Sequence, residues 1–486
     1  MNTPRDDNQV TAENENAGGS EDSGLMSRPD PATITGGNIP MTIWRLALPT
    51  WGAFVCLNLM GIVDMFFVGK LGPAAVASVA MGGIMIGIVV MLALGVGMGT
   101  TALVANAFGR DEPDEADLIT AQALTMAVFL AIMLAAVGVP LAPWIIHAMG
   151  GSPEVVREGG TYLRIVAGGG MALLVQISLA AALRGAGDAV TPMKALVAAI
   201  LINLVLDPIM IFGMFGFPAL GVAGSAWATV LGRSFGTLVL LRGLLASGDG
   251  ALSLRLHQLW PQFDTIRRIF RIGIFASGRA MLRNLSRLAL MRLAAMFGTP
   301  AVAAFGICFR LQMLILGPGK GFGTAAATMV GQNLGAGQPD RGERSGWTAA
   351  GTAMVVGLAF TAVFWGAPGL LIRVFNRDPR VVDAGIPLLR WFAGSFPFLL
   401  LGFVLNEAMT GAGDSLRPMI ITGLAQVLIG LPLAGLLASR WDSAEGIWAG
   451  FFAGNILVGI LSAVAFKRGH WKSVDVGAVP EMPPAR

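Results

Sequence analysis

The sequence predicts an all-α polytopic membrane protein with twelve transmembrane helices, arranged as two parallel six-helix repeats. Three observations lead to this fold class: the composition, the spacing of the apolar runs and an internal repeat. Of the 486 residues, 55% are hydrophobic and only 13% are charged, and the mean hydropathy is +0.70. A soluble protein of this size would carry about 25% charged residues. Since one bilayer crossing takes ~20 apolar residues, the chain has room for on the order of a dozen crossings.

Apolar runs separated by polar breaks mark the predicted spans. Each run is long enough for a helix to cross the hydrocarbon core. The spans are predicted at residues 43–67, 75–108, 118–147, 160–183, 194–215, 221–245, 272–297, 301–332, 346–374, 386–410, 417–438 and 444–466.

The Lys and Arg residues at the ends of the spans are distributed unevenly. With the N-terminus inside, the cytoplasmic ends of the spans receive most of them, including Arg184 at the end of the fourth span and Arg267, Arg268 and Arg271. The positive-inside rule therefore predicts an integral protein of the cell (inner) membrane with both termini in the cytoplasm.

Residues 1–40 differ in composition from the rest of the chain. They hold seven acidic residues against Arg5 and Arg28, and they are rich in Asn, Gly and Ser. Because such a segment cannot bury enough apolar area to order itself, it is predicted to be a disordered acidic cytoplasmic tail.

The second half of the chain repeats the first at a constant shift of 226 residues. Gly-Ala-Gly-Asp at 185–188 recurs at 411–414, and Pro113-Asp114 recurs as Pro339-Asp340. Six spans per copy is an even number, so both copies enter the membrane from the same side and the repeats are parallel.

The repeat predicts how the chain divides and how it works. Two matching bundles that face each other across a pseudo-twofold axis indicate an alternating-access transporter with its substrate site between them. The predicted parts are an N-lobe (41–246), a cytoplasmic inter-lobe linker (247–271), a C-lobe (272–470) and a C-terminal tail (471–486).

The sequence excludes several other classes of protein. Cys56 and Cys308 both lie in apolar segments, which argues against a disulfide scaffold and a Cys-rich metal site. No G-x-x-x-x-G-K-[ST] loop for ATP is present, and the dispersed basic residues do not form a nucleic-acid-binding patch. The prediction is a protein that is not an enzyme, needs no cofactor, binds no nucleic acid, and acts on a small molecule among membrane lipids as a monomer.

Six sequence blocks stand in order along the chain: VDMFFVGKLGPAAVA (63–77), RGAGDAVTPM (184–193), NLVLDPIMIFG (203–213), GVAGSAWATV (221–230), VGQNLGAG (330–337) and GAGDSLRPM (411–419). In this order, and together with the repeat, they make residues 41–470 resemble the multidrug and toxic compound extrusion (MATE) family. The resemblance implies V-shaped lobes and secondary active efflux of amphipathic organic compounds, usually cations, driven by inward movement of H⁺ or Na⁺.

Two acidic residues lie inside the predicted spans of the N-lobe. Asp64 lies late in the first span and Asp207 midway along the fifth, and a charge at the bilayer centre costs roughly 2.5–3.5 kcal/mol, so such residues tend to mark a pathway. Asn203 shares a helix face with Asp207, and Pro208 leaves one carbonyl without its helical N–H partner. This cluster of oxygens is predicted to bind a proton or a hard cation.

The two carboxylates would share a proton near neutrality if they lie close together, because both cannot readily ionise in a low dielectric. The alternative interpretation is two acids neutralised by structural hydrogen bonds. In the MATE pattern, Asp64, Asn203 and Asp207 match the N-lobe cation-site residues, and they are the expected ligands if the ion is Na⁺. The resemblance adds Ser225 or Thr229 on the sixth span as a hydroxyl donor.

The C-lobe lacks this cluster. The seventh span contains no Asp or Glu, which favours coupling in the N-lobe without deciding between H⁺ and Na⁺. At the shift of 226, the equivalent C-lobe positions are Leu290, Ile429 and Leu433.

The seventh span carries a basic stripe instead. Arg279, Arg283 and Arg287 recur every fourth residue and so lie on one helix face, ~12 Å long. Glu407 on the tenth span is the predicted partner of Arg287, with Asp414 next, and Lys320 on the eighth span is expected to compete for the same acids. The stripe has two interpretations: structural ion pairing in the C-lobe, or a water-filled cavity in which the arginines contact an anionic or zwitterionic substrate. Gln176 is a further candidate cavity residue.

The predicted function is therefore secondary active export of amphipathic compounds, with cations expected from the family resemblance, in exchange for H⁺ or Na⁺. The alternative is a flippase or exporter of an anionic lipid-linked or zwitterionic substrate in the same wider superfamily, which the basic stripe would suit.

Overall fold

The computed structural model describes residues 31–245 and 252–474, which form helices joined by loops. A short helix, α1 (Pro31–Gly36), precedes two bundles. The first bundle, the N-lobe, consists of α2 (Ile39–Gly69), α3 (Pro73–Gly109), α4 (Pro113–Ala148), α5 (Pro153–Gly168), α6 (Gly170–Gly185), α7 (Val190–Phe212) and α8 (Val222–Leu245).

The second bundle, the C-lobe, has the same order of long helices. It consists of α9 (Phe263–Ala295), α10 (Thr299–Gly335), α11 (Pro339–Gly366), α12 (Pro368–Arg373), α13 (Pro379–Gly411), α14 (Leu416–Thr422), the π-helix η4 (Gly423–Gly430), α15 (Leu431–Trp441) and α16 (Ala444–Lys467). Short 3-10 turns follow α7 at η2 (Met214–Gly216), precede α9 at η3 (Leu256–Leu259) and follow α16 at η5 (His470–Ser473).

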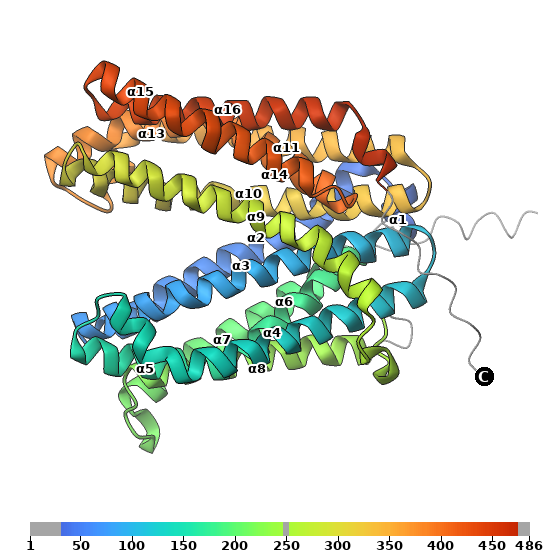
Figure 1. Cartoon of the computed structure of the whole chain (residues 1–486), viewed down its shortest axis with the longest axis horizontal. Coiled ribbons are helices and arrows are strands. Elements are labelled where there is room, and N and C mark those ends of the chain that lie inside the picture. Colours follow the sequence, from blue (N-terminus) through green and yellow to red (C-terminus); the bar gives the residue numbers. More distant parts are fainter. Residues whose placement is uncertain (1–30, 246–251, 475–486) are drawn as a thin grey trace, which may run out of the picture.

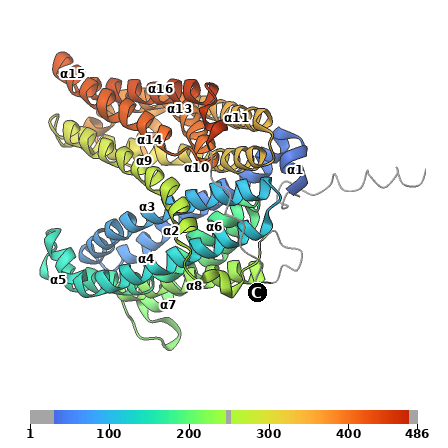
Figure 2. The ribbon, with the colours of Figure 1, turned by 45° about the vertical axis from the view of Figure 1, so that its right-hand side comes forward.

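The two lobes form a V. They meet at the end of the molecule that carries α1, here called the terminal end, and spread apart toward the opposite end (Figure 1). The divergence is equally clear when the molecule is turned by 45° (Figure 2).

The twelve predicted spans correspond to these helices. Nine helical segments in the described part of the chain are long and apolar enough to cross a membrane, and α5 with α6, bent by 47° around Gly169, makes a tenth. The continuous run of α14, η4 and α15 counts as one of the nine. α8 and α9 take the remaining two places in the bundles. α9 is less apolar because arginines recur along its length.

The helix boundaries follow the repeat. α3 and α10 begin and end at positions 226 residues apart, and α6 and α13 end at equivalent residues. The recurring Gly-Ala-Gly-Asp blocks form the turns after α6 and α13. Gly187 and Gly413 have φ of +89° and +93°, which side chains rarely tolerate. The following residues, Asp188 and Asp414, accept hydrogen bonds from backbone N–H groups at the start of the next helix.

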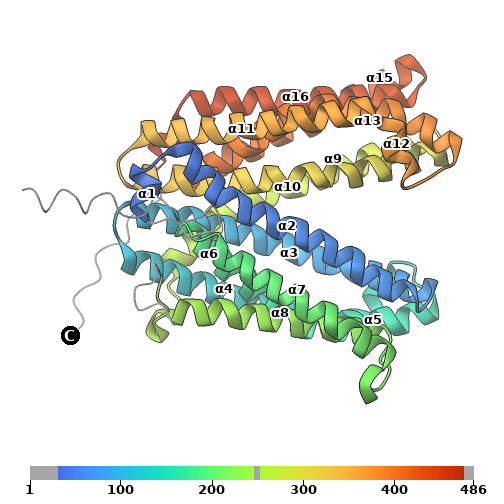
Figure 3. The ribbon, with the colours of Figure 1, turned by 180° about the vertical axis from the view of Figure 1, so that it is seen from behind.

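The first helix of each lobe begins in the core of the other lobe. Ile43 and Leu46 of α2 lie in the buried apolar cluster of the C-lobe, and α2 then runs into the N-lobe beside α7 (Figure 3). Ile269 and Ile272 of α9 belong in the same way to the N-lobe cluster, where α9 packs against α3. This exchange joins the lobes at the terminal end.

The prediction of a disordered tail is wrong for residues 31–40, which form α1 and the start of α2. Residues 1–30 lie outside the described part of the chain. Ile34 of α1 is fully buried, and its carbonyl accepts a hydrogen bond from Asn333 Nδ2 at 3.4 Å. Arg341 Nη2 donates to the carbonyl of Gly37 at 2.6 Å. These contacts hold the segment in the seam between the lobes, and average composition does not reveal them.

The predicted linker also needs correction, because α9 begins at Phe263 and not at 272. Residues 246–251 lie outside the described part. The backbone N–H and hydroxyl of Ser253 donate to the carboxylate of Asp117 on α4, and Arg255 pairs with Asp114 at 3.0 Å. These contacts fix the segment against the N-lobe.

The start of the predicted C-terminal tail is likewise ordered, and residues 475–486 lie outside the described part. Trp471 is fully buried and stacks on Phe466, with ring centroids 4.9 Å apart. Lys472 pairs with Asp340 at 3.0 Å and with Glu343 at 2.7 Å, both on α11. The segment that follows the last helix of each lobe is thus fixed by acids at the start of that lobe's third span.

Candidate functional site

A first group of polar side chains lies within the N-lobe, where α2, α7 and α8 meet. Ser225 Oγ donates to Asp64 Oδ1 at 2.8 Å, and Asn203 Nδ2 donates to Asp207 Oδ1 at 3.4 Å. Asn203, Asp207 and Ser225 are buried, and Asp64 is half-buried. Thr229 lies one turn after Ser225 and makes no hydrogen bond with the described residues.

An apolar cluster one turn further along places the two hydrogen-bonded pairs at the same level of the lobe. Val68 and Ile211 lie four residues after Asp64 and Asp207, and both are buried in one cluster together with side chains of α8. The two carboxylates therefore face the same region between α2, α7 and α8.

One oxygen of this group is left without a donor. Asp207 Oδ2 is buried and has no hydrogen-bond partner among the described residues. A buried, unsatisfied carboxylate oxygen is costly unless it is protonated or bound by a cation. The two carboxylates with the amide oxygen of Asn203 make a donor set that suits a proton or Na⁺.

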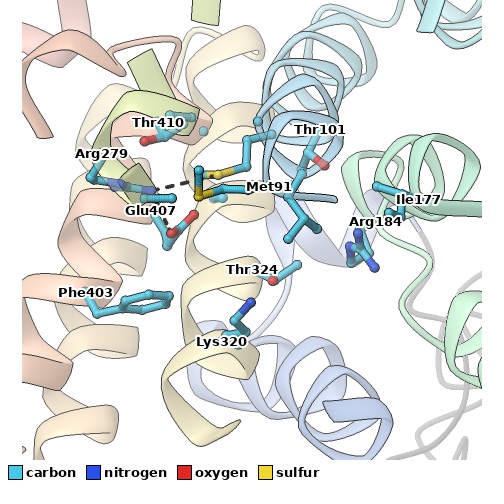
Figure 4. A pocket seen from close by; sticks show the side chains of 18 of the residues that line it. Met91, Thr101, Ile177, Arg184, Arg279, Lys320, Thr324, Phe403, Glu407 and Thr410 are labelled. Carbon is cyan, nitrogen blue, oxygen red and sulfur yellow. Dashed lines mark hydrogen bonds and ion pairs between the residues drawn. The ribbon is translucent and has the colours of Figure 1, made fainter. Parts of the chain in front are cut away.

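A second group lines a cavity of about 260 Å³ between the lobes (Figure 4). Its polar wall is mainly cationic: α6 contributes Arg184, α9 contributes Arg279 and Arg283, and α10 contributes Lys320. Glu407 of α13 is the one carboxylate among the described residues of the wall. Apolar side chains complete it, including Met91, Leu94, Met98, Ile177 and Phe403.

Glu407 pairs with Arg279, so the predicted Arg287–Glu407 pair is wrong. Arg279 Nη2 donates to Glu407 Oε1 at 2.8 Å. Glu407 lies one turn before the end of α13 at the terminal end, level with the earlier part of α9. Arg287 lies two turns further from that end, where its guanidinium lies 4.3 Å from the ring centroid of Phe309, outside the residues that line the cavity.

Most of the cationic side chains of the cavity have no carboxylate partner in the part of the chain that the structure describes. No carboxylate of the described residues lies within 4.0 Å of the cationic groups of Arg184, Arg283 or Lys320. Arg279 is 2% exposed, and its Nε and Nη1 are buried without an acceptor among the described residues. Arg283 lies 5.9 Å from the ring centroid of Phe403.

Sequence reasoning did not place Arg184 and Lys320 in the cavity. It assigned Arg184 to the cytoplasmic end of the fourth span and treated Lys320 as a competitor for nearby acids. Lys320 carried a usable signal, because a lysine in the middle of a 37-residue helix cannot reach the membrane surface.

Gln176 lines a neighbouring cavity, also of about 260 Å³, whose wall comes from the N-lobe and from Lys320 of the C-lobe. Arg233 Nη1 donates to Gln176 Oε1 at 3.3 Å. The two cavities share part of their walls: Thr50, Leu94, Ile177, Arg184 and Lys320.

Two symmetric hydrogen bonds close the seam between the lobes. Asn106 Nδ2 donates to the carbonyl of Gly411 at 3.2 Å, and Gln332 Nε2 donates to the carbonyl of Gly185 at 2.8 Å. Donors and acceptors are related by the shift of 226. We call these four residues the clasp. Gly411 also lines the cavity, so the clasp bounds the cavity on its terminal side.

The comparisons with known proteins agree with this architecture. A family model described as MatE matches residues 49–209 and 277–436, one match in each lobe. A probable multidrug resistance protein NorM of Thermotoga maritima is 28% identical over 443 residues, covering 88% of this chain and 92% of the relative. An FAD transporter of Shewanella oneidensis is 27% identical over 455 residues, covering 90% of this chain and 94% of the relative.

A solved structure has the same fold. It is described as the outward-facing conformation of a multidrug resistance MATE family transporter of the MOP superfamily. It superposes with a TM-score of 0.84 at 23% identity and covers 91% of this chain and 98% of its own.

Proposed function

This chain belongs to the MatE family, and from that membership we propose that it exports amphipathic organic compounds by alternating access in exchange for H⁺ or Na⁺. Members of this family are efflux transporters and not enzymes, and the chain is an integral membrane protein that acts on a small molecule. The cell inner membrane is the proposed location, with both termini in the cytoplasm.

The two lobes and the clasp support a mechanism of alternating access. With the terminal end in the cytoplasm, the clasp closes the cytoplasmic side while the lobes diverge toward the outside. Rocking of the lobes would break the clasp and close the opposite end. Both lobes and the cavity come from one chain, which supports a functional monomer that contacts membrane lipids, and no cofactor is required.

The N-lobe cluster is the proposed coupling site. This proposal depends on one observation: Asp207 Oδ2 is buried and has no hydrogen-bond partner among the described residues. Asp207 lies on α7, which packs against α2, the helix that carries Asp64. A proton would bind at this pair of carboxylates. A Na⁺ ion would be held by Asp64, Asn203 and Asp207, with Ser225 or Thr229 adding a hydroxyl. Either cation removes the cost of the unpaired charge, so its binding and release would bias the two conformations.

The experiment is export from proteoliposomes with ΔpH and ΔNa⁺ imposed separately. We expect one inward gradient to accelerate export of a loaded compound at least tenfold over counterflow without a gradient. If neither gradient changes the rate while counterflow persists, the protein is a facilitator and the coupling proposal is wrong.

A further inference from the structure

We infer that the cavity between the lobes binds the anionic group of an amphipathic compound, whereas the family resemblance favours cations. This inference rests on the proposed export function and adds the sign of the charge that is carried. Four cationic side chains and one carboxylate contribute to the described wall of the cavity, which leaves an excess of positive charge.

The described residues do not neutralise this excess of positive charge. Only Arg279 has a carboxylate partner, Glu407 at 2.8 Å, whereas Arg184, Arg283 and Lys320 have none among the described residues. Like charges in a poorly solvated space repel one another unless a counter-charge lies between them. A cleft lined by positive groups therefore concentrates anions and disfavours cations.

Arg279 also has unused hydrogen-bonding capacity. It is 2% exposed, and its Nε and Nη1 have no acceptor in the described part of the chain. A guanidinium offers paired N–H groups that match the oxygens of carboxylates, sulfonates and phosphates. Figure 4 shows Lys320 and Thr324 of α10 turned toward the same space as Arg184 and Glu407, so donors from both lobes converge there.

The rest of the wall suits an apolar body. Met91 and Met98 supply flexible, polarisable surfaces that adapt to rings of different shape. Ile177 and Phe403 extend this surface on opposite sides of the cavity. The cavity and its neighbour share a wall and so offer space for one charged group and one aromatic or short aliphatic body. The same anionic chemistry occurs in free organic anions and in lipid headgroups.

The test uses two fluorescent probes that share a ring and a linker and carry terminal groups of opposite charge. Dansyl-taurine carries a sulfonate, and dansylaminoethyl-trimethylammonium carries a quaternary ammonium on the same ring and linker. Binding of each to the full chain in nanodiscs is followed by dansyl fluorescence. We expect the sulfonate to bind at least tenfold more tightly, and its affinity to fall with rising salt. Equal affinity, tighter binding of the ammonium, or binding of neither probe would overturn the inference.

Two variants of α9 locate the effect. Arg283→Gln removes a cavity charge that pairs with no carboxylate of the described residues, so no carboxylate loses its partner. We expect about tenfold weaker sulfonate binding, the equivalent of ~1.4 kcal/mol. Arg287→Gln makes the same change on the same helix outside the cavity and should leave sulfonate binding unchanged. If both variants bind the sulfonate like the wild type, the cavity does not select the anion.

A third measurement separates the two sources of the anion. A short-chain NBD-phosphatidylglycerol and an unlabelled naphthalenesulfonate are each used to displace the sulfonate probe. If the ligand is a free organic anion, the naphthalenesulfonate should displace the probe more strongly. If it is a lipid headgroup, the phosphatidylglycerol should displace it more strongly. Since binding requires no ion gradient, an anion preference can hold even if gradient-driven export fails. Conversely, robust export of the ammonium probe alone would refute the anion inference and leave the export proposal intact.

Discussion

The two lobes match at the clasp and differ in the polar residues of their interiors and of the cavity between them. The clasp pairs Asn106 with Gly411 and Gln332 with Gly185, and all four positions obey the shift of 226. The polar interior does not follow this symmetry. Asp64, Asn203 and Asp207 have apolar counterparts in the C-lobe. At the same shift of 226, the N-lobe positions equivalent to Arg279, Arg283 and Glu407 are also apolar: Ala53, Leu57 and Ala181. The repeat therefore keeps the clasp contacts in both copies, whereas the Asp64–Asp207 carboxylates occur in the N-lobe alone and three of the four cavity cations come from the C-lobe.

The helix breaks differ in the same way. In the N-lobe the fourth span bends between α5 and α6, and α7 continues through Pro208. In the C-lobe α13 is continuous, and the eleventh span contains the π-helix η4 at the level where α7 carries Asn203. Gln426 in η4 donates to Asn455 Oδ1 at 3.2 Å, a structural contact between helices of one lobe. Each lobe thus has its own irregular span, and the spans are not equivalent.

The largest expected effect comes from removing the N-lobe charge. Asp64→Asn keeps the shape of the side chain and the hydroxyl contact of Ser225 but cannot be protonated and deprotonated. We expect gradient-driven export to be abolished while melting stays near the wild-type temperature. Asp383→Asn, an exposed acid of the C-lobe, is the matched control and should export normally. Wild-type export rates from Asp64→Asn would remove the functional difference between the lobes.

The next largest effect concerns the buried ion pair of the C-lobe. Glu407→Gln leaves Arg279 buried without a counter-charge, which we expect to lower the free energy of unfolding by about 3–5 kcal/mol. Adding Arg279→Met should restore much of the loss, because it removes the uncompensated charge. Thermal unfolding of the purified protein measures both. If the double variant is no more stable than Glu407→Gln alone, the loss of stability does not come from the uncompensated charge of Arg279.

The sequence was sufficient for the fold because its signals are local. Hydrophobic runs set the spans, and the Gly-Ala-Gly-Asp blocks recur because a turn with positive φ at Gly187 and Gly413 requires glycine in both copies. The exchange of α2 and α9 between the lobes could not be predicted, since it depends on contacts far apart in the sequence. The same is true of α1, whose order depends on where Ile34 packs.

From the residues alone, the contacts of the candidate site were predictable only where residues share a helix. The i, i+4 spacing of Asn203 and Asp207 predicted one shared face, and in the structure Asn203 Nδ2 donates to Asp207 Oδ1 on that face. The same spacing gave the basic stripe but not its partners, because the level of Glu407 relative to α9 is set by packing between helices. Arg184 was missed because a basic residue at a span end has the ordinary explanation of topology.

A smaller effect is expected at the clasp, where the lobes are alike. Asn106→Ala and Gln332→Ala each remove one hydrogen bond between the lobes, and each should shift the balance toward the clasp-open state by about 1 kcal/mol. Symmetry predicts similar shifts. Distances between spin labels on the two lobes measure the populations, and Thr120→Ala, which removes a bond within α4, is the control. A large shift for one variant and none for the other would show that the interface is not functionally symmetric.

The smallest effect compares the segments that follow the last helix of each lobe. Hydrogen bonds to Glu343 and Asp340 raise the pKa of Lys472 above its ordinary value, so folding favours the charged amine. Its contribution is complete below the ordinary lysine pKa of about 10.4 and disappears as the pH rises through the raised one. Lys472→Met should therefore lower the free energy of unfolding by less than about 1 kcal/mol at pH 7, and this loss should vanish at high pH.

In the N-lobe, Arg255 pairs with Asp114, and a guanidinium keeps its charge over the same range. The loss of unfolding free energy caused by Arg255→Met should therefore shrink in high salt but stay constant with pH. A pH-independent loss for Lys472→Met would instead show that the aliphatic part of Lys472, and not its charge, holds the C-terminal segment.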